Sequence, residues 1–131
     1  MGLRMRSYLD SDVLIGHLRG DRRASAFLQR LSTGSHDNLW IGALQRMEIV
    51  FFMHPDEADD TEALLQRFHT DPVTEEIVDY AGVLYRQWHP SHGTGINDCV
   101  LAAMALLSGG KIYTRNLKHF PMPGLSVVRA W

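Results

Sequence analysis

The hydrophobic positions of this chain follow two different spacings. Short, bounded apolar runs are typical of buried strands, whereas apolar residues that recur every three or four positions are typical of one face of a helix. The short runs predict strands that end at Leu9, that cover residues 39–42, 111–114 and 125–128, and that include a strand-like link at 71–74. Turn and cap residues separate these runs from the helical stretches.

The helical spacing predicts six helices between these strands. The first follows a cap at Ser11 or Asp12 and stops near Gly20, and the second runs from an Asp21 cap to Thr33-Gly34-Ser35. The others cover residues 43–53, 56–69 and 75–88 and, after a loop at 89–95, the stretch from an Asn97 cap to Gly109. Strands that alternate with helices indicate a three-layer α/β/α fold with a central, mainly parallel sheet of four to five strands.

Composition narrows the class of protein further. The chain has 131 residues, of which 45% are hydrophobic and 21% charged, and this is typical of one globular domain. The sequence contains no run long enough to span a membrane and no apolar core of a signal peptide, and its single cysteine excludes an internal disulfide. We therefore expect a cytoplasmic protein without a membrane partner. The net charge of −2 provides no general basic surface for nucleic acid.

Polar side chains follow two of the predicted strands. Asp10 comes directly after the first apolar run, and Thr114 and Asn116 close the run at 111–114. The carboxyl ends of parallel strands meet at one edge of a sheet, where open α/β folds bind ligands. Asn116 alone is also an ordinary turn residue.

Two further acids lie on predicted helices. Glu48 falls within the apolar stripe of Leu44, Met47 and Phe51, which predicts a carboxylate facing the core, where it needs a partner. Asp98 lies in the first turn of the most apolar helix, where the helix dipole already favours an acid. Each acid alone therefore has an ordinary structural explanation.

Together, these acids predict a cation site. Two carboxylates about 4 Å apart repel by roughly 4 kcal/mol at an effective dielectric constant near 20. A domain of this size is stable by only about 5–15 kcal/mol, so a convergent cluster needs a counter-charge. Carboxylate and amide oxygens favour Mg²⁺ or Mn²⁺, and this ligand set, in a chain with a single cysteine, argues against zinc.

Four segments, in this order, resemble the motifs of PIN-domain ribonucleases, and most closely those of VapC-type toxins of bacterial toxin–antitoxin pairs. The segments are Tyr8-Leu9-Asp10-Ser11-Asp12-Val13-Leu14-Ile15, Glu48 on its helix, Ile96-Asn97-Asp98-Cys99-Val100-Leu101-Ala102-Ala103 and Thr114-Arg115-Asn116-Leu117-Lys118-His119-Phe120. The resemblance implies a single PIN-like domain over residues 1–131 and a metal-dependent endoribonuclease that leaves a 3′-hydroxyl and a 5′-phosphate. It also implies a homodimer, held inactive by a cognate antitoxin whose tail enters the active site.

The resemblance also assigns roles to individual residues. The implied catalytic residues are Asp10, Glu48, Asp98 and Asn116, of which Asp10, Asp98 and Asn116 contact the Mg²⁺ or Mn²⁺ ion. Ser11 and Thr114 are implied hydroxyl partners in the substrate site, and Arg115 and Lys118 are candidate contacts to the RNA phosphates. Asn116 replaces an acid found in many relatives, and His119 stands where another acid is frequent. We therefore expect one firmly held cation.

Two alternatives remain open at the level of sequence. Asp10-Ser11-Asp12 also matches the Asp-x-Asp nucleophile motif of haloacid-dehalogenase-like phosphatases, but that family needs a core lysine and a later acidic pair. The chain offers only Lys111 and Lys118, and no adjacent acidic pair follows Asp98. The other alternative is a PIN-like module that binds RNA or protein without catalysis. Its RNA binding would be indifferent to metal and to Asp10→Ala.

Overall fold

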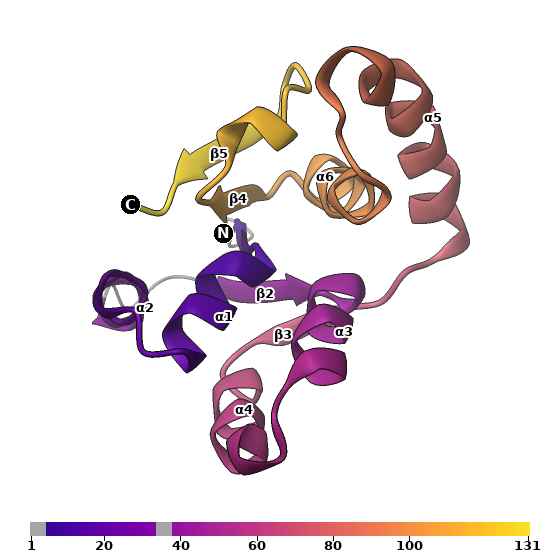
Figure 1. Ribbon diagram of the computed structural model, residues 1–131. Coiled ribbons are helices and arrows are strands. Elements are labelled where there is room, and N and C mark those ends of the chain that lie inside the picture. The colour runs from indigo at the N-terminus through magenta and orange to yellow at the C-terminus, as the bar shows by residue number, and fades with distance from the viewer. Residues whose placement is uncertain (1–4, 34–37) are drawn as a thin grey trace.

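The sheet confirms the predicted fold class. The computed structural model describes residues 5–33 and 38–131, so Gly34 and Ser35, the predicted end of the second helix, lie outside the described residues. Five strands form one sheet in the order β3-β2-β1-β4-β5, and every neighbouring pair is parallel (Figure 1). The strands are β1 (Arg6–Leu9), β2 (Asn38–Gly42), β3 (His69–Asp71), β4 (Lys111–Thr114) and β5 (Ser126–Arg129).

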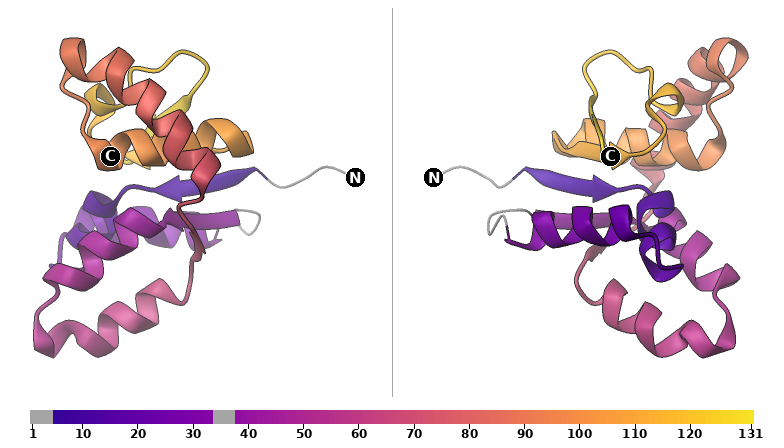
Figure 2. Two further views of the ribbon diagram at one scale, coloured as in Figure 1. Left: turned by 90° about the vertical axis from the view of Figure 1, so that its right-hand side faces the viewer. Right: turned by 60° about the vertical axis from the view of Figure 1, so that its left-hand side comes forward.

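Helices cover both faces of this sheet. They are α1 (Ser11–Leu18), α2 (Arg22–Thr33), α3 (Ala43–Phe52), α4 (Ala58–Leu65), α5 (Glu75–His92) and α6 (Ile96–Ser108), with short 3₁₀ turns η1 (Pro55–Glu57) and η2 (Leu117–His119). Figure 2 shows α5 and α6 on one side of the sheet and α1 to α4 on the other. Among the described helices, none combines the length and the apolar character needed to cross a lipid bilayer.

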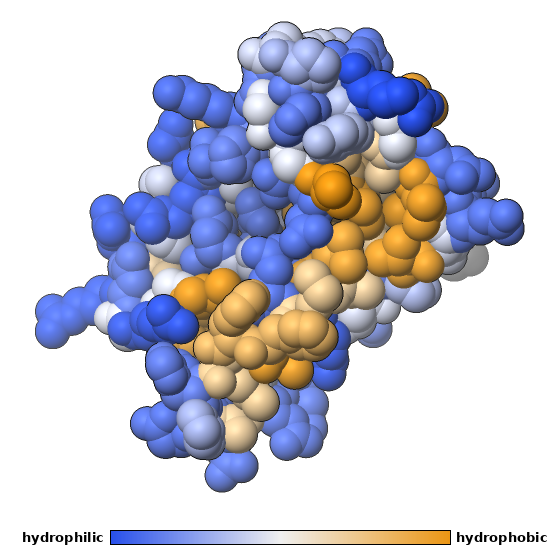
Figure 3. All heavy atoms as spheres, turned by 45° about the vertical axis from the view of Figure 1, so that its right-hand side comes forward, coloured by the Kyte–Doolittle hydropathy of each residue, from blue (hydrophilic) through white to orange (hydrophobic). Residues whose placement is uncertain are grey.

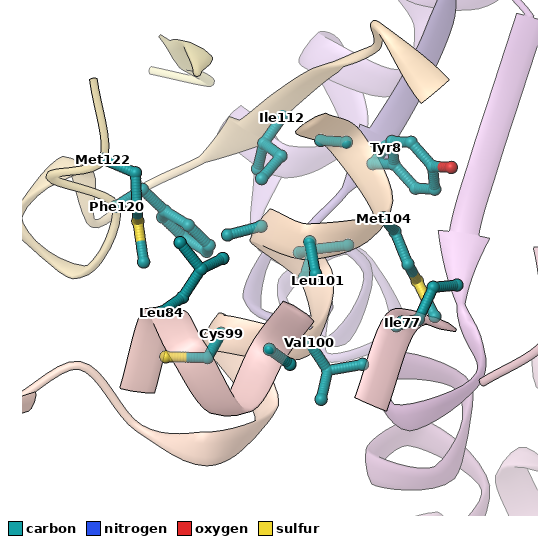
Figure 4. Packing of buried hydrophobic residues seen from close by; sticks show 14 residues of the cluster. Tyr8, Ile77, Leu84, Cys99, Val100, Leu101, Met104, Ile112, Phe120 and Met122 are labelled. Carbon is teal, nitrogen blue, oxygen red and sulfur yellow. The ribbon is translucent and has the colours of Figure 1, made fainter. Parts of the chain in front are cut away.

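The alternation of side chains along β1 divides the core into two clusters. Tyr8 points into the cluster beneath α5 and α6, whereas Leu9 points into the cluster formed with α1 to α4. Helix α6 is buried over Cys99–Ala105, as its apolar sequence predicts. In Figure 4, Phe120 and Leu84 pack beside this helix, so the segment after β4 is fixed to the core. This packing holds the ends of β1 and β4 and the start of α6 in constant relative positions.

Several predicted element boundaries are wrong. Helix α5 continues to His92 instead of ending at Trp88. Pro90 lies in its last turn, where the missing backbone N–H does not stop the helix, and Gly93, with a φ of 65°, ends it. Helix α4 ends at Leu65, four residues before the predicted end at His69, and His69 begins β3, which pairs with β2. The predicted strand-like link therefore lies two residues too late. The position of this strand is set by its pairing with β2, and the sequence pattern of the segment alone does not show with which strand it pairs.

Candidate active site

Asp10 is held between two elements at the carboxyl edge of the sheet. Its backbone N–H donates to the Tyr113 carbonyl at 3.0 Å, which continues the pairing of β1 with β4. One carboxylate oxygen accepts from the Ser11 backbone N–H at 2.9 Å, and the other accepts from the Thr114 hydroxyl at 2.9 Å. Asp10 is therefore the N-cap of α1, and the predicted cap at Ser11 or Asp12 is wrong. The extended backbone of Asp10, the last residue before the helix, makes it the cap.

Glu48 connects three helices at the same edge. Its Oε2 accepts from the Ser11 hydroxyl of α1 at 3.1 Å, and its Oε1 accepts from the Asn97 amide of α6 at 3.3 Å. Asn97 is not the cap of α6, because Gly95 occupies that position. The amide of Asn97 thus binds the carboxylate of Glu48 and fixes its orientation.

The stripe of α3 that contains Glu48 does not face the core as predicted. Gln45 and Ile49 are the buried residues of α3, whereas the side chain of Phe51 is 72% exposed. The polar Gln45 is buried where α3 meets α6. Of the predicted stripe, Leu44 is half-buried against the cluster beneath α5 and α6, whereas Phe51 is turned toward the surface. Apolar periodicity alone does not show which of two adjacent stripes a helix buries.

Asp98 belongs to a chain of hydrogen bonds that returns to β4. Its Oδ2 lies 3.1 Å from the His119 Nδ1, and the Asn116 amide nitrogen lies 3.0 Å from the His119 Nε2. The backbone N–H of Asn116 donates to the Thr114 hydroxyl at 3.0 Å, and that hydroxyl in turn donates to Asp10. The four residues implied by the resemblance thus gather at one edge of the sheet. Their catalytic roles stay predictions.

Burial and mutual repulsion make this cluster electrostatically unfavourable. Burial, followed by the charges of Asp12 and Asp98, raises the pKa of Asp10 to about 7, although the hydrogen bonds from Thr114 and Ser11 oppose the shift. Burial also raises the pKa of Asp98; His119 opposes this shift, and Glu48 and Asp12 add to it. Carboxyl groups with raised pKa values that lie together in one cluster are typical of functional sites.

Asp12 is a member of the cluster that the motif comparison missed. Burial raises its pKa, whereas the backbone N–H groups of Arg115 and Val13 oppose the shift. Its Oδ1 is buried and has no hydrogen-bond partner among the described residues. The sequence feature that could have identified Asp12 is its spacing from Asp10, because residues two apart here place both acids at the start of α1.

The oxygen donors of this cluster fit a hard divalent cation. The Oδ1 of Asp12 has no hydrogen-bond partner among the described residues, and burial together with the charges of Asp12 and Asp98 raises the pKa of Asp10, so a cation bound here would favour the ionised carboxylates. Within residues 5–33 and 38–131, no group of three or more His, Cys, Asp or Glu residues forms a ready-made metal cage. Mg²⁺ is suited to such a site, because it is usually bound by one or two carboxylates and keeps several water ligands.

The four residues expected to contact substrate fall into two groups. Ser11 and Thr114 are buried, and their hydroxyl groups donate to the carboxylates of Glu48 and Asp10; their place in the substrate site stays a prediction. Arg115 and Lys118 are exposed, and the Arg115 guanidinium lies 4.8 Å from the centre of the Trp131 ring. Both cations remain candidate phosphate contacts.

Comparison with known proteins identifies the family. The model of the PIN domain matches residues 7–121, which include every residue of the cluster described above. The chain belongs to the PIN-domain family. The match confirms the resemblance drawn from the four motifs and leaves the haloacid-dehalogenase-like alternative without support, because the PIN match includes Asp10 and Asp12.

The curated relatives of this PIN domain are VapC proteins. The chain is 36% identical over 115 residues to "Ribonuclease VapC10" of Mycobacterium tuberculosis, which covers 87% of this chain and 85% of the relative. It is 30% identical over 116 residues to "Ribonuclease VapC19" of the same species, covering 87% and 91%. Among solved structures, DNA-bound VapBC from Salmonella typhimurium matches with a TM-score of 0.79 at 18% identity, over 97% of this chain and 99% of the other. This last likeness shows the shared fold.

Proposed function

We propose that this chain is a Mg²⁺- or Mn²⁺-dependent endoribonuclease and the toxin of a toxin–antitoxin pair. The observation that carries the proposal is the convergence of Asp10, Asp12, Glu48 and Asp98; burial, followed by the charges of Asp12 and Asp98, raises the pKa of Asp10 to about 7, and Glu48 adds to the raised pKa of Asp98. The ribonuclease names of its curated relatives support RNA as the substrate. The non-catalytic alternative requires no such acidic cluster.

The geometry supports distinct roles for these residues. Asp10 and Asp98 would hold the cation, with Asn116 beside them, and Glu48 would accept the proton of the attacking water. When bound, the cation polarises a phosphoryl oxygen and makes water a better nucleophile. Water then attacks the phosphorus, the bond to the 3′-oxygen breaks, and the products carry a 3′-hydroxyl and a 5′-phosphate.

Ordered partners support the assignment of Glu48 as the base. Its two oxygens are held by Ser11 and Asn97, so the carboxylate has one orientation relative to Asp98. The exposed Arg115 and Lys118 lie on the segment that follows β4, where they would contact the phosphates of RNA.

Removal of divalent metal tests the proposal directly. Cleavage of a structured RNA is expected to stop in excess EDTA and to return when Mg²⁺ or Mn²⁺ exceeds the chelator. Analysis of the fragment ends should show 5′-phosphates. Cleavage that continues undiminished in EDTA, with a control for contaminating nucleases, would contradict a metal-dependent reaction.

The antitoxin is proposed from the neighbouring structures and from the apolar surface beside the acidic cluster. The structures similar in fold include toxin–antitoxin complexes. Phe52 and Met53, at the end of α3, line a hollow that also includes Glu48 and Arg19. A protein segment bound there would lie next to Glu48 and would block access to the cluster. Copurification with the product of the adjacent small reading frame would identify this partner.

A second apolar surface supports the proposed homodimer. A groove of about 430 Å³ lies between α3, α5 and α6 and is lined mainly by apolar side chains, among them Leu44, Val78, Ile96 and Val100. Ile96 and Val78 are more than half exposed in the single chain. Figure 3 shows apolar side chains gathered over one face of the molecule. Such a large exposed apolar area is typical of an interface.

A charge in this groove is expected to separate the dimer. Val78→Glu buries an unpaired carboxylate in the interface, so the dissociation constant should rise by at least about tenfold. Light scattering coupled to size-exclusion chromatography measures the mass. Val83→Glu is the matched control, because Val83 is a similarly exposed valine of α5 that does not line the groove. A monomeric wild type, or dimers in both variants, would contradict the proposed surface.

A further inference from the structure

We propose that His119 is a positioning residue that holds the Asp98 carboxylate in its cation-binding orientation, an inference that rests on the proposed metal-dependent function. His119 lies on the η2 turn after β4, within 3.1 Å of the Asp98 carboxylate and 3.0 Å of the Asn116 amide.

The imidazole lies between two site residues and uses both of its nitrogens. Its Nε2 accepts from the Asn116 amide at 3.0 Å, which leaves the proton on Nδ1, and Nδ1 donates to the Asp98 Oδ2 at 3.1 Å. One oxygen of Asp98 is thereby occupied, and Oδ1 is left for a cation. The same ring orients the amide of Asn116, so a single side chain aligns two residues of the site.

The backbone places this ring with little freedom. The His119 N–H donates to the Asn116 carbonyl at 3.2 Å and closes the η2 turn. The next residue, Phe120, is 5% exposed and packs into the core beneath α5 and α6. The hydrophobic anchor at Phe120 therefore fixes the position from which the imidazole reaches Asp98.

Asp98 needs such a restraint because its other neighbours repel it. Glu48 and Asp12 are both near enough to disfavour its charge, and His119 is the neighbour that favours it. Without the donor, the carboxylate is free to rotate away from these two acids and from the cation position. Partners that orient metal ligands typically change metal affinity by about 10- to 100-fold when they are removed.

A pair of variants of similar size separates positioning from packing. In His119→Asn the amide nitrogen stands near the position of Nδ1 and can still donate to Asp98, whereas His119→Leu fills the space without a donor. The readout is the dissociation constant for Mn²⁺ alone, measured by electron paramagnetic resonance at constant pH. We expect His119→Leu to bind Mn²⁺ 10- to 100-fold more weakly than wild type. His119→Asn should recover at least half of that loss on a logarithmic scale.

Controls make each outcome decisive. His92→Ala, an exposed histidine at the end of α5, should leave Mn²⁺ affinity unchanged. Equal affinity in wild type and His119→Leu would overturn the role of His119 and leave the proposed function intact. Equal weakening by Leu and Asn would assign His119 to packing and also overturn it. A wild-type protein that binds no Mn²⁺ at millimolar concentration would contradict the proposed function itself.

Thermal unfolding of each variant shows that it is folded, and His119→Ala replaces the leucine variant if that variant is unfolded.

Discussion

Asp98→Asn is expected to lower RNA cleavage by at least about 100-fold while leaving the metal-free protein as stable as wild type, or more stable. The amide oxygen can still accept from His119 Nδ1, so the hydrogen bond at 3.1 Å is retained. The substitution removes one negative charge from a cluster in which Glu48 and Asp12 repel Asp98, so folding is not weakened. The loss of activity follows because an amide is a poorer ligand for a hard dication than a carboxylate.

Initial cleavage rates and urea unfolding of the same preparations measure the two quantities. Asp79→Asn on α5 is the control, since Asp79 is an exposed acid with the same change in charge. It should cleave RNA at the wild-type rate. An Asp98→Asn protein that cleaves RNA as fast as wild type would remove Asp98 from the active site. A large loss of stability would show that the carboxylate serves the fold.

Asp10→Asn is expected to stabilise the protein at alkaline pH when no divalent cation is present. The pKa of Asp10 is about 7 in the folded protein and near 4 in the unfolded chain. Between these values the folded state holds a proton that the unfolded state has lost, so the free energy of unfolding falls as the pH rises from 4 to 7. Each unit of pKa corresponds to about 1.4 kcal/mol, so the variant should gain roughly 2–4 kcal/mol at pH 8.

This difference should fall to about 1 kcal/mol near pH 4.5 and vanish below pH 4, where Asp10 is protonated in the folded and the unfolded protein alike. Asparagine keeps the cap of α1, because it is as good an N-cap as aspartate. Urea unfolding at pH 4.5 and pH 8 in EDTA gives the comparison, and Mg²⁺ should then stabilise wild type more than the variant. Asp98 is shifted in the same direction, so a smaller pH dependence remains in Asp10→Asn. A variant that is less stable than wild type at both pH values would contradict this electrostatic account.

The sequence was sufficient to predict the elements whose signals are local. The strand before Asp10, the buried helix α6 and the strand at residues 111–114 follow from bounded apolar runs and their caps. The carboxyl edge of the sheet, and with it the meeting of Asp10 with Thr114, follows from parallel strand pairing.

Features decided by tertiary contacts were not predictable in the same way. Leu44 and Phe51 have the spacing of a core face, but Phe51 is exposed, and α3 buries the polar Gln45 against α6. The Nδ1 contact of His119 with Asp98 joins residues of α6 and η2, and no spacing along the chain encodes it. Asp12 was visible as an acid two residues after Asp10, but only its burial beside Asp98 makes it part of the site.

The most direct measurement is anomalous diffraction from crystals of the wild-type protein soaked in Mn²⁺. The account predicts a strong manganese peak within coordination distance of the carboxylates of Asp10 and Asp98, and no such peak in Asp98→Asn crystals treated in the same way. An empty carboxyl edge at saturating Mn²⁺, or a manganese ion bound only elsewhere on the molecule, would contradict it.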